Sequence, residues 1–152
     1  MEKKYILTEE TKEVGGRILH RIQAVRDFDA VQKGDLGGWV ESEENLSHDG
    51  NCWVFGDGRV FGDGEVFGNA RIGVNAYISS PRSYFVQGPI GSRDDFLTYY
   101  LDKDKKIYAV TGCFSGTLEE FEKKVKETHG SNKHAKQYLK AAEMARVMLS
   151  GD

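Results

Sequence analysis

The chain has 152 residues, of which 39 % are hydrophobic and 30 % charged, which suffices for one sizeable core or two small ones. It contains no apolar run of the ~18 residues that a membrane-spanning helix needs, and its first residues lack the apolar stretch of a secretory signal, so we expect a cytoplasmic protein without a membrane partner. Residues 1–80 carry a net charge of −5 and residues 81–152 one of +2, which argues against a protein coated for duplex DNA.

Two strands are predicted at the N-terminal end, at residues 4–8 and 17–25, separated by a pair of glycines. In the second strand, alternation predicts one face made of Ile18, His20, Ile22 and Ala24. We expect the two strands to pair and to cap the structure that follows, because an open sheet edge invites aggregation.

The middle of the chain repeats every six residues, which is a signature of repeat architectures. The columns of the repeat are the aliphatic residues Val54, Val60, Val66, Ile72 and Ile78, the glycines Gly56, Gly62 and Gly68, the polar residues Asp57, Asp63, Asn69 and Asn75, and the small residues Gly58, Gly64, Ala70 and Ala76. Asp-Gly pairs are also typical of hairpins, but six residues per unit leave strands too short for a meander.

A short left-handed parallel β-helix explains the repeat better than hairpins do. Its aliphatic residues would fill the interior, and the Gly-Asp or Gly-Asn pairs would turn the corners, where positive φ is needed. With three hexads per coil, Val54 and Ile72 should stack. Phe55, Phe61 and Phe67 should point outward, so the tail or a second copy of the chain should cover them.

The run from Val54 to Ala70 resembles the hexapeptide repeat of left-handed β-helix proteins. More narrowly, it resembles largely uncharacterised bacterial and phage proteins with Val-Tyr-Gly-Asn-Ala repeats, in which segments like 33–40 and 44–54 precede the repeats. Segments 91–93 and 112–121 also resemble the tails of that group. The resemblance implies the β-helix fold, and its phage members suggest a counter-defence role.

After residues 79–83, which we expect to link domains 1–80 and 81–152, the pattern predicts a small ββαα unit within an overall mainly β chain with an α+β tail. A short strand at 84–86 precedes a hairpin of strands 96–101 and 107–113. Thr117 and Glu120 form a capping box, Gly130 ends the first helix, and Ser131 is predicted to cap the second. The buried stripe predicted for the second helix is Ala135, Tyr138, Leu139, Ala142, Ala145 and Leu149.

An anion site is the main candidate for ligand binding in the tail. The loop at 88–93 supplies glycines whose N–H groups can converge on a phosphate or carboxylate, with a plain turn as the alternative. A basic helix adds further cations, although such charges are often only a solvated face. The predicted ligand-binding residues are Gly91, Ser92, Arg93, Phe114, Lys133, His134 and Tyr138.

Catalytic and metal chemistry are less well supported by the sequence. His48 beside Asp49 could serve as the general base of a hexapeptide acyltransferase, or simply lie at a corner. The four histidines and the cysteines Cys52 and Cys113 show no metal-ligand spacing, Cys113 has no sequence partner for nucleophilic chemistry, and no cofactor is expected.

The function we expect is binding rather than catalysis. A homo-oligomer would sequester a small anionic, nucleotide-like ligand, with Trp39, Trp53, Phe114 and Tyr138 as candidates for stacking on a base. Two alternatives stay open: an acyltransferase of the hexapeptide type, and a structural or protein-binding module that uses the phenylalanines of the repeat.

Overall fold

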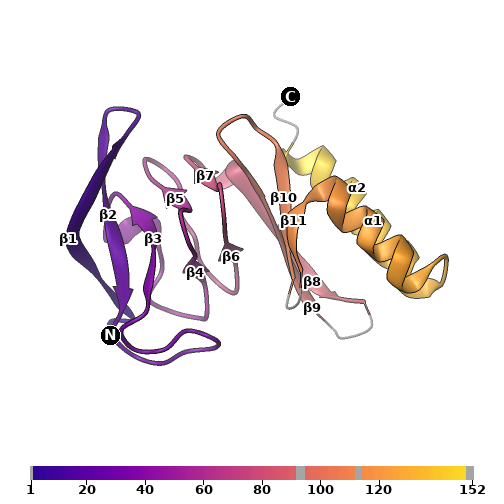
Figure 1. Ribbon diagram of the computed structural model, residues 1–152, viewed down its shortest axis with the longest axis horizontal. Coiled ribbons are helices and arrows are strands. Elements are labelled where there is room, and N and C mark those ends of the chain that lie inside the picture. The colour runs from indigo at the N-terminus through magenta and orange to yellow at the C-terminus, as the bar shows by residue number, and fades with distance from the viewer. Residues whose placement is uncertain (1, 92–94, 112–113, 150–152) are drawn as a thin grey trace. The chain divides into compact units, whose positions relative to one another are not determined.

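The computed structural model describes residues 2–91, 95–111 and 114–149, and the chain is mainly β with two helices at its C-terminal end (Figure 1). It divides into two compact units, Met1–Pro81 (unit 1) and Arg82–Asp152 (unit 2). Neither of the helices in the described residues combines the length and the hydropathy needed to cross a membrane.

Unit 1 contains a five-stranded sheet that begins at the N-terminus. Strands β1 (Tyr5–Val14), β2 (Arg17–Ala24) and β3 (Leu36–Val40) pair antiparallel, and β5 (Arg59–Val60) and β7 (Tyr77–Ile78) then add in parallel. The order is β1-β2-β3-β5-β7, so the two N-terminal strands extend the sheet to which the repeat contributes (Figure 1).

The repeat also forms a second, two-stranded parallel sheet from β4 (Trp53–Val54) and β6 (Arg71–Ile72), while a short 3-10 helix, η1, occupies Glu43–Asn45. Val54 pairs with Ile72 and Val60 pairs with Ile78, so chain segments eighteen residues apart lie side by side. This confirms the predicted stacking of Val54 and Ile72. The sheets of unit 1 do not close on themselves.

The aliphatic column of the repeat forms the core of unit 1, as predicted. Its members are at most 1 % exposed: Val54, Val60, Val66, Ile72 and Ile78. Leu46 and Val40 join them and are also fully buried, and Leu46 bridges to Val66 in parallel. Burial of branched aliphatic side chains supplies the main stabilisation of this unit.

The corner residues adopt the backbone conformation that the sequence predicts. Gly56, Gly62 and Gly68 have φ values of 56°, 59° and 67°, and Asn75 has 66°. At the fourth column a larger residue would not fit everywhere, because a Cβ at Gly64 would lie 2.7 Å from the Ile78 carbonyl oxygen.

The phenylalanines that follow the aliphatic column differ from one another in burial. Phe61 is only 7 % exposed, because its ring meets the edge of Tyr77 at 4.9 Å between centroids. The Arg71 guanidinium lies 5.6 Å from the Phe55 ring, whereas Phe67 is 61 % exposed. Residues of unit 1 itself therefore contact Phe55 and Phe61, and Phe67 is the most exposed of the three rings.

Neither of the two predicted faces of β2 is uniformly buried. Ile18 is 52 % exposed, while its neighbour Leu19, which belongs to the other predicted face, is fully buried. The pairing of β1 with β2 shifts register between Leu7 and Thr11, and the pairing of β2 with β3 shifts between Arg21 and Gln23, so both neighbours of β2 are irregular along this stretch. Ile22 and Ala24, which belong to the same predicted face as Ile18, are buried.

Unit 2 begins near a short 3-10 helix, η2, at Pro81–Ser83 and has an antiparallel sheet of order β11-β10-β9-β8. The strands are β8 (Tyr84–Ile90), β9 (Asp95–Leu101), β10 (Ile107–Val110) and β11 (Ser115–Thr117). The predicted ββαα unit is thus incomplete, because β8 is longer than expected and β11 was not predicted.

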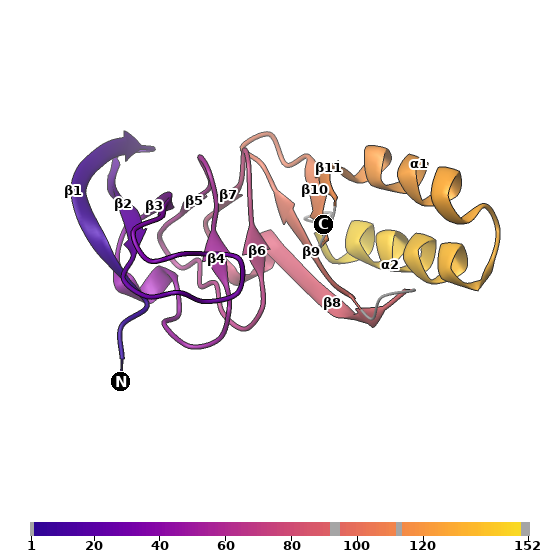
Figure 2. The same ribbon diagram turned by 60° about the horizontal axis from the view of Figure 1, so that its bottom comes forward.

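Two helices, α1 (Leu118–His129) and α2 (Lys133–Leu149), lie side by side against the sheet of unit 2 (Figure 2). The capping box of Thr117 and Glu120 and the Gly130 C-cap are confirmed. The predicted Ser131 cap is wrong: Asn132 Oδ1 instead accepts a hydrogen bond from the Ala135 N–H at 3.0 Å. The buried stripe of α2 packs on Leu97, Tyr99 and Ala109 of the sheet.

Acidification is expected to weaken unit 1 through Glu41. Its carboxylate accepts hydrogen bonds from the Gly62 N–H at 2.8 Å and from Arg17 at 2.9 Å, and the Gly62 bond is the main reason that its pKa lies below the usual value. Since the folded-state pKa is lowered, the stabilisation is present above the unfolded-state pKa of about 4.3 and is lost as the pH falls through and below it. Urea denaturation between neutral pH and pH 3 should show a smaller loss for Glu41→Gln than for the wild type; equal losses would contradict this role.

Candidate functional site

A row of alternating cations and aromatic rings crosses the five-stranded sheet of unit 1. Arg21 is paired with Trp39, Trp39 with Arg59, and Arg59 with Tyr77, and residues paired in this way share one face of a sheet. The residues that follow the last three, Val40, Val60 and Ile78, are fully buried on the opposite face. We call Arg21, Trp39, Arg59 and Tyr77 the cation–aromatic row; its members are half-buried.

Two glycines place Trp39 in this row. A Cβ at Gly38 would lie 2.5 Å from the Gly58 carbonyl oxygen and from Val54 Cγ1, and one at Gly37 would lie 2.7 Å from the Val54 carbonyl oxygen. Only glycine therefore lets β3 lie directly on the repeat. The Trp39 N–H then donates to the Gly58 carbonyl at 2.9 Å, which fixes Trp39 beside Arg59.

The cations of the row lie over its rings. Lys12 Nζ from β1 lies 4.6 Å from the Trp39 ring centroid and Arg21 Cζ lies 5.7 Å from it, while Arg59 Cζ lies 5.2 Å from the Tyr77 ring. Such contacts contribute about 0.5–1 kcal/mol each at exposed positions and more when shielded from water. Arg59 is held in place by donating from Nε to the Ala76 carbonyl at 3.2 Å.

The electrostatics of the row favour an anion. Burial and then repulsion from Arg59 and Arg21 lower the pKa of Lys12, with Asp57 acting in the opposite direction. Glu10 is already bound to Arg21 at 3.2 Å. Within the described residues Lys12 forms no salt bridge, so this group of cations is only partly compensated and can stabilise added negative charge.

The ligand-binding residues predicted for the tail are in part close together in unit 2. A Cβ at Gly91 would overlap the Tyr138 hydroxyl, so these two residues are in direct contact, and the Gly91 N–H donates to Gln137 Oε1 at 3.0 Å. The His134 ring lies 5.7 Å from the His129 ring, and its Nδ1 is buried with no hydrogen-bond partner among the described residues. Ser92 and Arg93 lie outside the described residues.

The aromatic members of that prediction lie in the core of unit 2. Tyr138 is 6 % exposed; His129 stacks on it at 5.6 Å and Phe121 meets it edge-on at 5.9 Å. Phe114 contacts the same Phe121 ring at 5.6 Å between centroids. Lys133 is exposed at the start of α2. Trp53 of unit 1, another candidate for base stacking, is 2 % exposed and belongs to the core.

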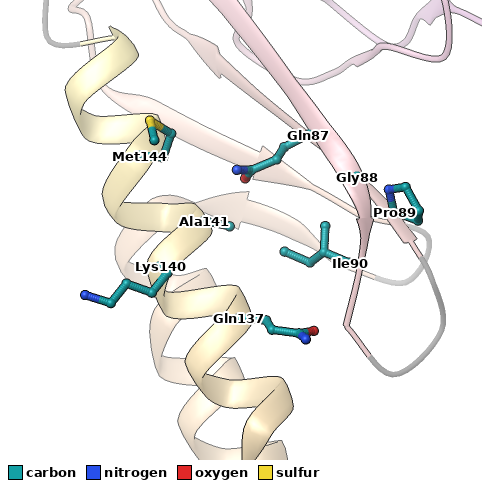
Figure 3. A pocket seen from close by; sticks show the side chains of 8 residues that line it. All are labelled: Gln87, Gly88, Pro89, Ile90, Gln137, Lys140, Ala141 and Met144. Atoms are coloured by element: carbon teal, nitrogen blue, oxygen red, sulfur yellow. The ribbon is translucent and has the colours of Figure 1, made fainter.

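Sequence reasoning did not predict a groove between β8 and α2. It has a volume of about 470 Å³ and is lined by Gln87, Gly88, Pro89, Ile90, Gln137, Lys140, Ala141 and Met144. Figure 3 shows Gln87 and Ile90 pointing from β8 toward α2, whereas Lys140 points away from the strand. Gln87 Oε1 is buried with no hydrogen-bond partner in the part of unit 2 that the structure describes.

His48 is held by contacts that leave no free ring nitrogen. Its Nδ1 accepts a hydrogen bond from the Lys4 N–H at 3.0 Å, so the ring proton is on Nε2, which lies 2.8 Å from Glu43 Oε1. The ring also stacks on Tyr5 at 4.2 Å between centroids. Asp49, the orienting residue predicted from the sequence, is not the partner of either nitrogen.

The cysteine and metal predictions have limited structural counterparts. Cys52 is a buried free thiol, and burial raises its pKa; Lys4 Nζ donates to its carbonyl oxygen at 2.6 Å and lies 3.4 Å from its sulfur. Cys113 lies outside the described residues. In the ranges 2–91, 95–111 and 114–149 no group of three or more histidine, cysteine, aspartate or glutamate residues could hold a metal ion.

Comparison with known proteins gives a relative that matches part of the chain. No family model matches the chain. A segment of 61 residues is 38 % identical to the uncharacterized acetyltransferase YdcK of Escherichia coli (strain K12). The match covers 35 % of this chain and 19 % of YdcK, so the chain corresponds to about a fifth of that relative.

Proposed function

We propose that this chain is a non-catalytic binding protein whose cation–aromatic row binds a small anionic, nucleotide-like ligand. The observation that carries the proposal is the register that places Arg21, Trp39, Arg59 and Tyr77 in one row, with Lys12 over Trp39. Aromatic rings beside cations are the combination that recognises a base together with its phosphate.

The scaffold we infer for this site is a short left-handed β-helix. Its support is the buried aliphatic column, the positive φ at the corner glycines and the parallel pairing of residues eighteen apart, which equals three hexads. The handedness rests on the resemblance of the repeat to hexapeptide proteins. Such a scaffold supplies a rigid surface for binding without a deep cavity.

The oligomeric state, the cellular compartment and the phage origin of this protein stay predictions. Phe67 is 61 % exposed, and a second copy of the chain that packs on this apolar side chain would form a homo-oligomer. That the protein is cytoplasmic, of phage or prophage type, and sequesters an immune signal of a bacterial host follows only from the sequence and from the resemblance to phage proteins. The anion site predicted around Gly91 and Lys133 is a second place for the same class of ligand.

The alternative is an acyltransferase of the hexapeptide type, and the similarity to part of YdcK favours it. The obstacle to this function is His48. A general base needs a free lone pair, and the Nδ1 lone pair of His48 is already bound to the Lys4 N–H. An acyltransferase would therefore need another base or a rearrangement of the N-terminal strand.

Titration of the full-length chain with nucleoside mono- and triphosphates, followed by calorimetry and thermal unfolding, tests the proposal. A ligand at 100 times its Kd should stabilise the fold by about 2.7 kcal/mol. Arg59→Ala should weaken binding roughly tenfold, since a charge-assisted contact is lost. Arg71→Ala is the matched control, because Arg71 also lies over an aromatic ring, Phe55, but outside the row.

Three results would count against the proposal. Absence of stabilisation by any nucleotide would remove its basis. Equal losses in Arg59→Ala and Arg71→Ala would point to unspecific attraction of anions. Turnover of acetyl-CoA that is abolished in His48→Ala would instead support the acyltransferase.

A further inference from the structure

The spacing of the two rings in the row limits the size of the ligand. Trp39 and Tyr77 lie on β3 and β7, which are separated in the sheet by β5. Neighbouring strands are about 4.8 Å apart, so the two aromatic residues stand about 10 Å apart. One base can stack on only one of them, and a mononucleotide would leave the second ring without a partner.

The groups between and beside the rings suit the linkage of two bases. Arg59 stands between Trp39 and Tyr77 in the register, and its Nε and Nη2 donate to the carbonyls of Ala76 and Asn75 at 3.2 and 3.4 Å. Of its five N–H groups, those of Nη1 make no hydrogen bond within the described residues and can donate to a phosphate oxygen.

The N-terminal hairpin adds a flank to the row. Lys12 lies over Trp39, and a Cβ at Gly15, in the turn of the hairpin, would lie 3.5 Å from the Tyr77 hydroxyl. The hairpin therefore approaches both ends of the ring pair, and Lys12 supplies a second cation for a phosphate next to Trp39. A ligand in the row would be bound along its length rather than at a single point.

We propose that the row binds a ligand with two bases joined through phosphate, such as a dinucleotide or a two-nucleotide stretch of a single strand, rather than a mononucleotide. This rests on the proposed function. One base stacks at Trp39, the other at Tyr77, and the phosphate between them meets Arg59. Since stacking and phosphate contacts carry the binding, the recognition is tolerant of base sequence.

Fluorescence anisotropy with a labelled thymidine dinucleotide, and competition by unlabelled thymidine oligonucleotides of one to six residues, tests this on the full chain. Affinity should rise roughly tenfold or more from one nucleotide to two, because a second ring is engaged, and should then level off. Trp39→Ala and Tyr77→Ala should each reduce affinity for the dinucleotide to the level of the mononucleotide. Arg71→Ala should leave both affinities unchanged.

The outcomes separate this inference from the proposed function. If the mononucleotide binds as tightly as the dinucleotide, the two-base inference is wrong while the binding function stands. If neither binds, both are wrong. A steady gain with every added nucleotide, equally reduced in all variants, indicates unspecific electrostatic attraction and overturns the inference. Trp39→Phe keeps an aromatic ring and should therefore retain the rise in affinity from one nucleotide to two. This variant is the control that distinguishes loss of stacking from misfolding caused by a change at position 39.

Discussion

Replacing Trp53 by alanine is expected to destabilise unit 1 by about 3–5 kcal/mol, the usual cost of removing a large aromatic side chain from a core. Trp53 is 2 % exposed and packs edge-on against Phe28 at 5.2 Å and against Tyr5 at 6.1 Å between centroids. The cavity left behind would remove the packing between the repeat and Tyr5 of the N-terminal strand. Urea denaturation followed by circular dichroism measures the loss.

The matched control for this variant is Trp39→Ala. Trp39 is half-buried on the outer face of its sheet, so its loss should cost clearly less stability while weakening ligand binding. Trp53→Ala, where it remains folded, should retain binding. If both tryptophans prove equally important for stability, Trp39 is part of the core and the row is a structural feature.

The core of unit 1 could be predicted from the sequence because its repeat is regular. Val54, Val60 and Ile72 lie in a column whose period of six also fixes which residues pair, and a glycine or asparagine with positive φ marks where the chain turns. The capping box at Thr117 was predictable for a different reason. Its hydrogen bonds are local and join residues only three positions apart.

Features that depend on tertiary contacts escaped prediction. The exposure of Ile18 and the burial of Leu19 depend on the strands that pair with β2, which no local pattern encodes. Phe61 is covered because Tyr77 lies one strand further along the sheet, and β11 is too short to show an alternation. In each case residues distant in sequence decide the outcome.

The candidate site likewise contains residues that the repeat pattern places and residues that tertiary contacts place. Arg59 and Tyr77 are separated by three hexads, so their pairing follows from the repeat period. Arg21 and Trp39 precede the regular repeat, and their position follows from the strand order and from the glycines before Trp39. For Tyr138, the helical pattern correctly predicted burial, and that burial leaves little of its ring for a ligand.

Replacing Gly38 by alanine is expected to cost about 3 kcal/mol or more of folding stability, the upper end for overpacking, and to abolish ligand binding. A Cβ there would lie 2.5 Å from the Gly58 carbonyl oxygen, a backbone atom that cannot move without breaking the bond it accepts from the Trp39 N–H. β3 would be forced off the repeat, and Trp39 would leave the row. Chemical denaturation and nucleotide titration of one preparation measure both effects.

Gly34→Ala provides the control, because it separates backbone strain from overpacking. Gly34 has a φ of 96°, but a Cβ added there would meet no atom within 4 Å, so alanine brings strain of about 1–2 kcal/mol without a clash. This variant should bind ligand as the wild type does. Should Gly38→Ala be as stable as Gly34→Ala and still bind, β3 does not rest on the repeat as described, and the register that creates the cation–aromatic row has no structural basis.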